Sequence, residues 1–344
     1  LYGSGHLHQL NRDGQVVCDV ERDRLHREVL RTQGQLHTRS AYDRSGRLHS
    51  RARRHDSRPR PLPADSTKTY EYDLTDNLVA RVEQQRHGEH QTLYGYDSSS
   101  RIMTAQDSVS RLLERFAYDP AANLVGGESA KTRVTHNRLL TWQDKHYRYD
   151  SFGRLSEKRS IRRGLQRFVY DAESRLIEVQ NPDRHVVRMT YDPLGRRIGK
   201  TLHHPNGQML SETTFIWDGL RLLHEAQNGL PTLYLYADDS HEPLARVDGR
   251  GEHQTLRHYH NDLNGLPEQL TEPDGHLVWH ARYLAWGNTT QETREPYFLE
   301  QQNLRFQGQY LDRETGLHYN TFRYYDPDIG RFTTPDPIGL AGGL

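Results

Sequence analysis

Polar and apolar residues alternate along short stretches of this chain, and these stretches are rich in β-branched and aromatic side chains. Arg167-Phe-Val-Tyr170 and Val186-Val-Arg-Met-Thr-Tyr191 show the pattern, with charged residues between the apolar ones. Such alternation puts one face of a strand against protein and the other in water, so it predicts an all-β chain of short strands. Helical spacing is confined to residues 296–304, where we expect one short packing helix.

A Tyr-Asp pair recurs along the chain and defines a repeat. Each pair is followed a few residues later by Gly, Asn or Ser, often by Arg, and then usually by an aliphatic residue. Successive tyrosines are 30, 24, 22, 31, 21 and 21 residues apart, which suits one β-hairpin per repeat. The pairs are Tyr42-Asp43, Tyr72-Asp73, Tyr96-Asp97, Tyr118-Asp119, Tyr149-Asp150, Tyr170-Asp171 and Tyr191-Asp192.

The residue types of the repeat fit a tight turn between two strands. Tyr ends a strand with a ring that covers a neighbour, Asp caps the turn, and Gly or Asn supplies a positive φ. A second set of turns marks the opposite strand ends, so the sequence predicts a long, winding antiparallel sheet. These turns are Asp13-Gly14, Asn206-Gly207, Asn228-Gly229, Asp248-Gly249, Asn264-Gly265 and Asp274-Gly275. Because single hairpins are marginal, we expect the chain to be the tail of a longer array.

Composition limits the kind of core and the kind of partner. Only 33% of residues are hydrophobic while 20 are Tyr, which favours a thin, Tyr-rich β structure over a thick aliphatic core. Lys+Arg and Asp+Glu are 46 each, so no global field attracts nucleic acid or anionic lipid. The single cysteine, Cys18, cannot form an internal disulfide, and no apolar run approaches the ~20 residues of a membrane span. We expect synthesis in a reducing cytoplasm.

Two polar clusters have structural explanations. The basic tract from Arg44 to Arg60 lacks interleaved aromatic residues and runs into a proline-rich stretch, so residues 56–66 are the best loop or linker candidate and no nucleic-acid site is predicted. The histidines have no third partner at metal-ligand spacing, so we expect solvated strand histidines, no metal and no cofactor. They are His203, His204, His253, His258 and His260.

Two aspartates near the C-terminal end are candidates for catalysis. Asp312 and Asp336 lie in Asp/Gly turns on either side of the predicted hairpin at residues 323–332, 24 residues apart, and folding of that hairpin would bring them together. Peptide hydrolysis by carboxylates needs two that share a proton. A purely structural explanation also fits each motif taken alone, because Asp and Pro are preferred at the first two positions of a type I turn. Reserve residues for the site are Asp326, Glu314 and Arg305.

The closing motif is the most specific feature of the chain. Arg323-Tyr-Tyr-Asp-Pro-x-x-Gly-Arg-Phe precedes Asp336-Pro-Ile-Gly-Leu-x-Gly-Gly, and together with the repeats this resembles the Rhs/YD-repeat family of bacterial polymorphic toxins, over roughly residues 40–344. Some relatives carry Asp-Pro-x-Gly at the first turn, where this chain has Asp312-Arg-Glu-Thr-Gly316, so Glu314 is a possible substitute.

The resemblance implies a fold and a function. The expected fold is a large spiralling antiparallel sheet, the β-cocoon shell, at residues 1–300, with an inward-folded C-terminal plug at residues 301–344. The expected function is to enclose a C-terminal toxin and release it by a single-turnover, aspartic-protease-like cut in cis after Leu344. Implied partners are the toxin, the N-terminal remainder of the core, a secretion spike or PAAR-type module and a chaperone. Export from a bacterial cytoplasm by a contact-dependent or type VI-like machine is implied too.

A second function class remains open at this point. YD-repeat sheets also occur in extracellular adhesion modules, which bind glycans or other cells and are not cut. The closing Asp-Pro-Ile-Gly-Leu motif favours the toxin shell. An ordinary hydrolase acting on external substrates lacks any Ser/Cys-His arrangement in this sequence.

Overall fold

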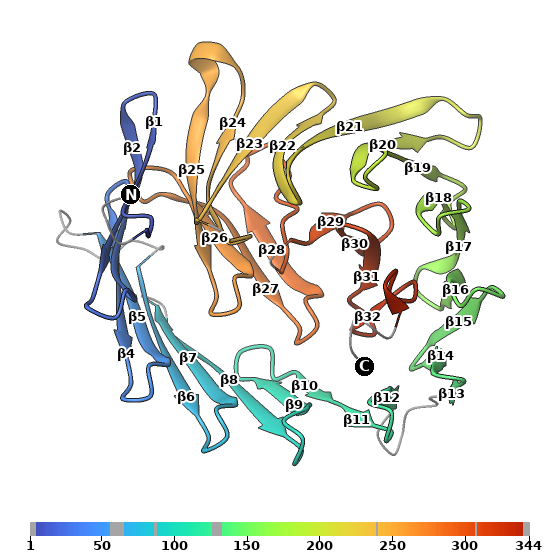
Figure 1. Cartoon of the computed structure of the whole chain (residues 1–344), viewed down its shortest axis with the longest axis horizontal. Helices are drawn as coiled ribbons and strands as arrows, with labels where there is room; N and C mark the ends of the chain where they lie inside the picture. Colours follow the sequence, from blue (N-terminus) through green and yellow to red (C-terminus); the bar gives the residue numbers. More distant parts are fainter. Residues whose placement is uncertain are drawn as a thin grey trace. The chain divides into compact units, whose positions relative to one another are not determined.

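A computed structural model of the chain describes residues 5–55, 65–85, 88–125, 133–238, 240–306 and 308–339. These residues form antiparallel strands joined by tight turns, with one 3₁₀ turn, η1 (Gly251–His253), and no α-helix among them (Figure 1). The prediction of an all-β chain with large antiparallel sheets is therefore confirmed.

The chain divides into two compact units. The first unit contains Leu1–Arg115, Tyr234–Ala285 and Thr289–Glu300, and the second contains Phe116–Leu233, Trp286–Asn288 and Gln301–Leu344. The chain passes from the first unit to the second between Glu300 and Gln301. That point coincides with the predicted start of the plug, whose role as a separate domain stays a prediction.

Strands of the first unit pair with their neighbours in chain order. The first ten strands form one sheet, and β24 to β28 follow one another in the same antiparallel manner. Their bounds are β1 (Gln9–Arg12), β2 (Gln15–Arg22), β3 (Glu28–Gln33), β4 (Leu36–Tyr42), β5 (Leu48–His55), β6 (Ser66–Tyr72), β7 (Leu78–Gln85), β8 (Gly88–Tyr96), β9 (Ile102–Asp107), β10 (Leu113–Arg115), β24 (Pro243–Asp248), β25 (Thr255–Asn261), β26 (Pro267–Thr271), β27 (Leu277–Tyr283) and β28 (Thr289–Arg294).

The second unit has the same sequential pairing and ends in a small sheet of its own. Strands β29 to β32 form this four-stranded sheet, and β23 (Leu230–Tyr236) is the strand in which the chain changes unit. The other bounds are β11 (Ala117–Tyr118), β12 (Leu124–Val125), β13 (Arg133–Thr135), β14 (Arg138–Trp142), β15 (Lys145–Tyr149), β16 (Leu155–Ser160), β17 (Gly164–Tyr170), β18 (Leu176–Gln180), β19 (Val186–Tyr191), β20 (Arg197–His203), β21 (Met209–Asp218), β22 (Arg221–Gln227), β29 (Tyr310–Asp312), β30 (Leu317–Asn320), β31 (Arg323–Asp326) and β32 (Arg331–Phe332).

The Tyr-Asp turn has one geometry throughout, and Asp192 illustrates it. One carboxylate oxygen accepts the backbone N–H groups of Leu194 and Arg196, both at 2.9 Å. The other oxygen accepts Nε of Arg196 at 2.7 Å. The third residue after the aspartate, here Gly195, has a φ of +79°. Several other Tyr-Asp turns also have a positive φ at this position. The predicted Asp cap and positive φ are confirmed.

Two repeats, the turns at Asp73 and Asp119, show that the prediction for asparagine was wrong in detail, because neither Asn77 nor Asn123 has the positive φ. In the turn at Asp73 the positive φ belongs to Asp76, at +66°, and not to Asn77. Asn77 instead donates its side-chain N–H to Asp73 at 3.0 Å, in place of the usual arginine. Asp tolerates the left-handed region because its short polar side chain bonds locally, so asparagine is left free to brace the turn.

Adjacent repeats are joined by the same Tyr and Arg side chains. The guanidinium of Arg47 lies over the ring of Tyr72, 4.7 Å from its centre, and Tyr72 donates its hydroxyl to the carbonyl of Leu48 at 2.9 Å. The strand register shifts just before this tyrosine, between Glu71 and Tyr72. Tyr42, Tyr170 and Tyr191 likewise lie under the arginine of the preceding turn, which explains why Tyr and Arg recur together.

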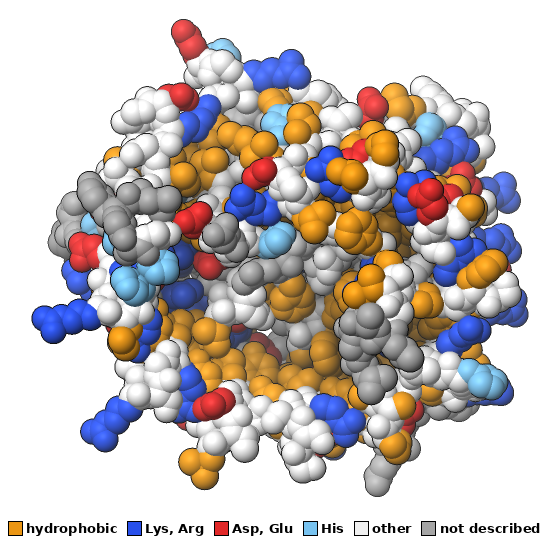
Figure 2. Space-filling model, viewed as in Figure 1, with side chains coloured by type: hydrophobic (Ala, Val, Ile, Leu, Met, Phe, Trp, Pro, Cys, Tyr) orange, Lys and Arg blue, Asp and Glu red, His pale blue; other side chains and the backbone are white. Residues whose placement is uncertain are grey.

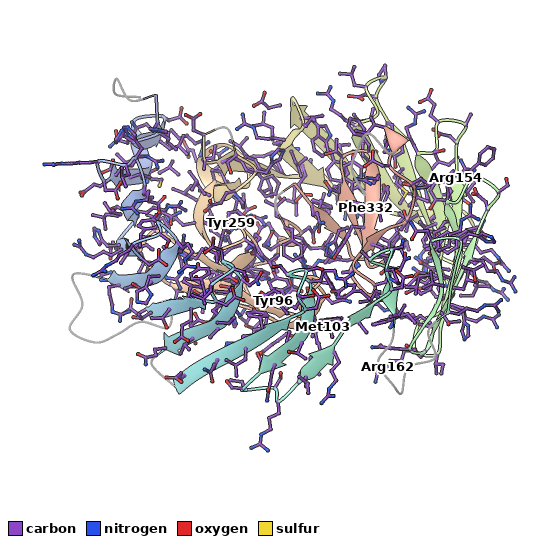
Figure 3. All side chains as sticks on the ribbon, turned by 60° about the horizontal axis from the view of Figure 1, so that its bottom comes forward. Tyr96, Met103, Arg154, Arg162, Tyr259 and Phe332 are labelled. Atoms are coloured by element: carbon purple, nitrogen blue, oxygen red, sulfur yellow. The ribbon has the colours of Figure 1, made fainter. Side chains whose placement is uncertain are left out.

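Tyrosines and ion pairs supply much of the interior. Tyr70, Tyr234, Tyr259 and Tyr319 are fully buried, which agrees with the prediction of a Tyr-rich core. Figure 3 labels Tyr259 in β25. Some charged side chains, such as Arg197, Arg246 and Asp312, are buried too. Outside, acidic and basic side chains are interspersed with hydrophobic ones, as Figure 2 shows for one face.

The predicted helix at residues 296–304 is absent. The described residues there form a turn and extended chain, and Leu304 makes an isolated bridge to Tyr310. Gln302 accepts the N–H of Leu304 at 2.8 Å and donates to its carbonyl at 3.0 Å, so side-chain bonds replace those of a helix. Of the predicted linker, residues 56–64 lie outside the described residues.

Candidate carboxylate site

The candidate site lies in the four-stranded sheet β29–β32. Asp312 ends β29, Asp326 ends β31, and Asp336 lies four residues after β32, whose Phe332 is labelled in Figure 3. Tyr310 pairs with Tyr319, and Tyr319 with Tyr324, across the first three strands. This register fixes which side chains share a face of the sheet.

Asp312 is fully buried against two basic residues of β20. Its Oδ2 accepts a hydrogen bond from Nη1 of Arg197 at 2.5 Å, and its Oδ1 is 3.2 Å from Nζ of Lys200. Burial alone would raise the pKa of the Asp312 carboxyl, but the two cations outweigh it and the pKa lies below its usual value. Asp312 is therefore held as a carboxylate.

Arg197 is enclosed by aromatic rings. Its guanidinium carbon lies 4.3 Å from the ring centre of Tyr319, 4.6 Å from that of Phe215 and 5.4 Å from that of Tyr310. Nε and Nη2 of Arg197 are buried without a hydrogen-bond partner in the structure, so ring faces take the place of acceptors. This packing fixes the arginine, and through it the carboxylate of Asp312.

Glu314, a reserve residue, belongs to the same cluster. Its Oε2 accepts Nζ of Lys200 at 2.8 Å. Lys200 therefore bridges two carboxylates of the same turn, those of Asp312 and Glu314.

Asp336 is partly exposed and has a different partner. One carboxylate oxygen is 2.9 Å from Nη1 of Arg323, and the other accepts the N–H of Ile338 at 3.0 Å. Arg323 in turn lies over the ring of Phe332, 3.7 Å from its centre. Asp336 therefore has the turn geometry that the Asp-Pro-x-Gly motif predicts, and it is anchored to β31 and β32.

The structure does not bring Asp312 and Asp336 into contact. Asp312 points to the same face of the small sheet as Tyr324, whereas Arg323, the next residue along β31, points to the opposite face. Each of the two aspartates is instead paired with its own arginine. Direct sharing of a proton would require one of these ion pairs to open.

Asp326 shares the face of Asp312. Both lie in one row of the sheet with Leu317 between them, so their backbones are about 10 Å apart, two strand spacings. Asp326 accepts Nζ of Lys158 at 2.7 and 2.9 Å, and Asp328 is 2.8 Å from the same Nζ. This is a second buried carboxylate cluster.

The pKa values of the buried carboxyl groups are shifted in different directions. Burial, together with competition from Asp328 for the one lysine, raises the pKa of Asp326. The pKa of Asp328 is about 2, because Lys158 outweighs its burial. Asp312 and Asp326 therefore lie on the same face with pKa shifts of opposite sign, lowered for Asp312 and raised for Asp326.

Arg305 and Leu344 complete the predicted residues. Arg305 is buried and donates to the backbone carbonyls of Gln302 and Leu304, at 3.3 and 2.9 Å, so these bonds brace the chain before β29. Leu344 lies outside the described residues.

Sequence reasoning missed the basic residues of the site. Arg197, Lys200 and Lys158 lie 100 or more residues from their carboxylates, so no local spacing connects them. One signal was present. Arg197 follows Arg196 at the position where other repeats have an aliphatic residue, such as Leu155 or Leu176. A charge at a core position of a repeat indicates a buried partner.

An aromatic pocket of about 220 Å³ adjoins the site. Its lining includes Tyr191, Tyr319, Tyr324, Phe322 and Pro337. The hydroxyls of Tyr191 and Tyr324 are 3.0 Å apart, and the pocket wall at Pro337 follows Asp336 directly. Such a lining suits an apolar side chain.

Two of the five histidines that were expected to be solvated, His258 and His260, differ from that prediction, whereas His203, His204 and His253 are partly or fully exposed. His258 and His260 are buried, 0% and 8% exposed, and not solvated. Their pKa values are depressed by burial, to about 4 for His258. Within the described parts of the chain, no group of three metal-ligating side chains gathers, and no helix is long and apolar enough to span a membrane.

Comparisons with known proteins agree with this fold. The Teneurin YD-shell family model matches residues 64–340. Over 99% of its length the chain is 42% identical to "Double-stranded DNA deaminase toxin A" of Burkholderia cenocepacia and 30% identical to "Probable deoxyribonuclease RhsB" of Dickeya dadantii. It is 29% identical, again over 99%, to "Toxin protein Tse5" of Pseudomonas aeruginosa. It covers 26%, 24% and 30% of these relatives, so it spans about a quarter of their length.

One solved structure shows the same fold. The Tc holotoxin pore of Photorhabdus luminescens matches 95% of this chain with a TM-score of 0.73 and 17% identity, and the match covers 18% of that chain. The fold and the repeats define a YD-shell protein. The chain belongs to the Rhs/YD-repeat family, as the sequence predicted.

Proposed function

We propose that this chain is the C-terminal part of a toxin-delivery shell, which encloses a toxin joined to its C-terminal end and releases it by cutting itself after Leu344. The observation that carries the proposal is that near-complete matches occur in proteins named for different activities, a DNA deaminase and a deoxyribonuclease. A segment common to both does not account for the difference between these activities, which supports a role that the toxins share.

Self-cleavage is assigned to aspartate carboxylates. Asp312, held ionised by Arg197 and Lys200, is the general base that takes a proton from the attacking water. Asp336 is the proposed second carboxylate, which requires its ion pair with Arg323 to open. Asp326, with a raised pKa on the same face as Asp312, is the alternative proton donor. Each pairing predicts a different inactive variant.

The test uses the full-length protein with its native residues on both sides of this chain. Asp312→Asn, Asp336→Asn and Asp326→Asn are compared with the parent by intact mass, and Asp13→Asn, an exposed turn aspartate, is the matched control. We expect fragments that end and begin at the bond after Leu344 in the parent and the control, and no cut in Asp312→Asn. Loss of the cut in Asp336→Asn or in Asp326→Asn identifies the second carboxylate.

Enclosure and export need their own test. The partners implied here are the toxin, the rest of the core, and a spike or PAAR-type module with a chaperone for a type VI-like machine. Protease added to the folded full-length protein should spare the toxin region until the shell is unfolded. A parent that is neither cut nor protective would favour a YD-repeat adhesion module.

A further inference from the structure

The aromatic pocket beside the carboxylate site has the size of a binding site for one side chain. Its volume of about 220 Å³ is below the roughly 300–1,000 Å³ of most small-molecule sites. Two of its large apolar side chains remain in water, since Leu194 is 68% exposed and Phe322 is 49% exposed. They are neighbours, because the ring of Phe322 would be 3.4 Å from a Cβ at Gly195. Apolar surface gathered around a pocket indicates an apolar occupant.

The polar groups of the lining are already satisfied by one another. The hydroxyls of Tyr191 and Tyr324 are 3.0 Å apart. Burial raises the pKa of both tyrosines, to about 12 for Tyr324, so both are neutral at neutral pH. Arg175, the basic residue of the lining, is 2.6 Å from Asp171 and 2.8 Å from Glu173. The pocket therefore favours an uncharged, apolar side chain over an anion.

One wall of the pocket also encloses the ion pair of Asp312. Tyr324 lines the pocket, and its hydroxyl accepts a hydrogen bond at 3.3 Å from Nη1 of Arg197, which pairs with Asp312. Tyr319 lines the pocket too, and its ring lies against the same guanidinium. Both tyrosines share the face of the small sheet that carries Asp312. An occupant of the pocket therefore contacts a wall that is two hydrogen bonds from the proposed general base.

The closing motif turns at another wall of this pocket. Pro337 lines the pocket and directly follows Asp336, the proposed second carboxylate. The N–H of Gly339 donates to the carbonyl of Asp336 at 2.9 Å, so residues 336–339 form a tight turn there. Leu344 is five residues beyond Gly339 in the sequence. Five extended residues reach at most about 18 Å, so the segment is long enough to bring Leu344 back to the pocket.

We propose that this pocket binds the side chain of Leu344 before the cut and thereby selects the bond that is cut. The inference rests on the proposed self-cleavage, in which the oxygen of one water goes to the carbonyl carbon of Leu344, the C–N bond breaks and a proton goes to the leaving amine. A leucine held against Tyr319 and Tyr324 places that bond beside Asp312, which takes the proton of the attacking water.

Cross-linking measures where residue 344 lies, whether or not the chain is cut. The full-length protein carries Leu194→Cys together with Leu344→Cys, and dibromobimane joins the two thiols only if they are close. Peptide mapping identifies the joined residues, and Cys18 is buried. Phe152→Cys with Leu344→Cys is the matched control, because Phe152 has the same position in its Tyr-Asp turn as Leu194 and is 72% exposed. Leu194→Cys with Leu340→Cys tests the other leucine of the closing motif.

A charge exchange tests whether the pocket selects the bond. Leu344→Glu should be cut at least about tenfold more slowly than the parent, because aromatic rings and the nearby Glu173 disfavour a carboxylate. Leu194→Lys supplies the opposite charge at the pocket and should restore much of the rate to Leu344→Glu. Phe152→Lys, the matched control, should restore none. Intact masses taken over time measure each rate.

We expect a cross-link between positions 194 and 344, none between 152 and 344 or between 194 and 340, and rescue by Leu194→Lys alone. Absence of the first cross-link, cutting of Leu344→Glu at the parental rate, or equal rescue by Phe152→Lys would overturn the proposal. The first cross-link in a parent that is never cut would confirm that the pocket binds Leu344 and would refute self-cleavage, so the two failures are distinguishable.

Discussion

Replacing Arg197 by Met is the most informative single change, because it removes a buried charge and nearly preserves the volume. Arg197 is fully buried, and its Nη1 is 2.5 Å from Oδ2 of Asp312. Removing one partner of a buried ion pair typically costs about 3–5 kcal/mol. Lys200 remains 3.2 Å from Asp312, and a thioether packs well on rings, so we expect the lower end, about 3 kcal/mol.

Hydrogen exchange of peptides covering β29 and β30 measures this loss where it occurs. A loss of about 3 kcal/mol speeds exchange through local opening by roughly 100-fold. Arg196→Met is the control. Arg196 is next to Arg197 in sequence, but it pairs with Asp192 in its own turn and not with Asp312. The double variant Arg197→Met with Asp312→Asn leaves no unpaired charge, so it should be more stable than Arg197→Met alone.

The pH dependence has a definite sign. The folded-state pKa of Asp312 lies below its unfolded value, so the ion pair stabilises the fold above the unfolded pKa, about 3.9, and this contribution is lost as the pH falls through the folded value. Arg197→Met should lessen this acid-induced loss. Unchanged exchange in Arg197→Met, or a double variant less stable than the single one, would refute the assignment of Arg197 as the residue that holds Asp312.

Three further predictions concern the rest of the fold. Burial lowers the pKa of His258 from 6.5 to about 4, so the unfolded chain takes up a proton at this residue before the folded one does. Protonation in the unfolded state therefore destabilises the fold as the pH falls from 6.5 to 4, by roughly 3 kcal/mol at pH 4. His258→Gln should make the urea unfolding midpoint depend less on pH over that range. Gly34→Ala places a Cβ 2.2 Å from the carbonyl oxygen of Pro273, at a φ of +59°. Gly14→Ala is the control, because its φ is +82° but nothing lies within 4 Å of the added Cβ, so Gly34→Ala should lower the melting temperature much more. An equal fall in melting temperature in the two variants would exclude the close contact. Tyr191→Phe removes a hydroxyl that donates to a backbone carbonyl at 2.6 Å and should cost about 1–2 kcal/mol in chemical unfolding, and a neutral result would deny that this bond joins the repeats.

The repeat could be predicted from sequence because its physics is local. Asp192 bonds to Arg196 and to backbone groups within four residues, so a short motif holds all the necessary information. The order of strands followed for the same reason, since each hairpin pairs with the next along the chain.

The partners of the candidate aspartates could not be predicted in this way. Asp312 is paired with Arg197, 115 residues away, and the pairing depends on how the small sheet packs within its unit. The prediction that the hairpin unites Asp312 and Asp336 neglected the pleat, which directs Arg323, the partner of Asp336, to the opposite face. The false helix at residues 296–304 arose because apolar spacing ignores glutamine side chains that bond to the backbone.

The intact mass of the full-length protein, read under denaturing conditions together with the N-terminal sequence of any smaller fragment, tests the central claim most directly. The account predicts two fragments whose boundary is the bond after Leu344, in a preparation that runs as one particle before denaturation. A single uncut chain in a correctly folded preparation, or a boundary elsewhere, would contradict the claim that this chain releases its own cargo.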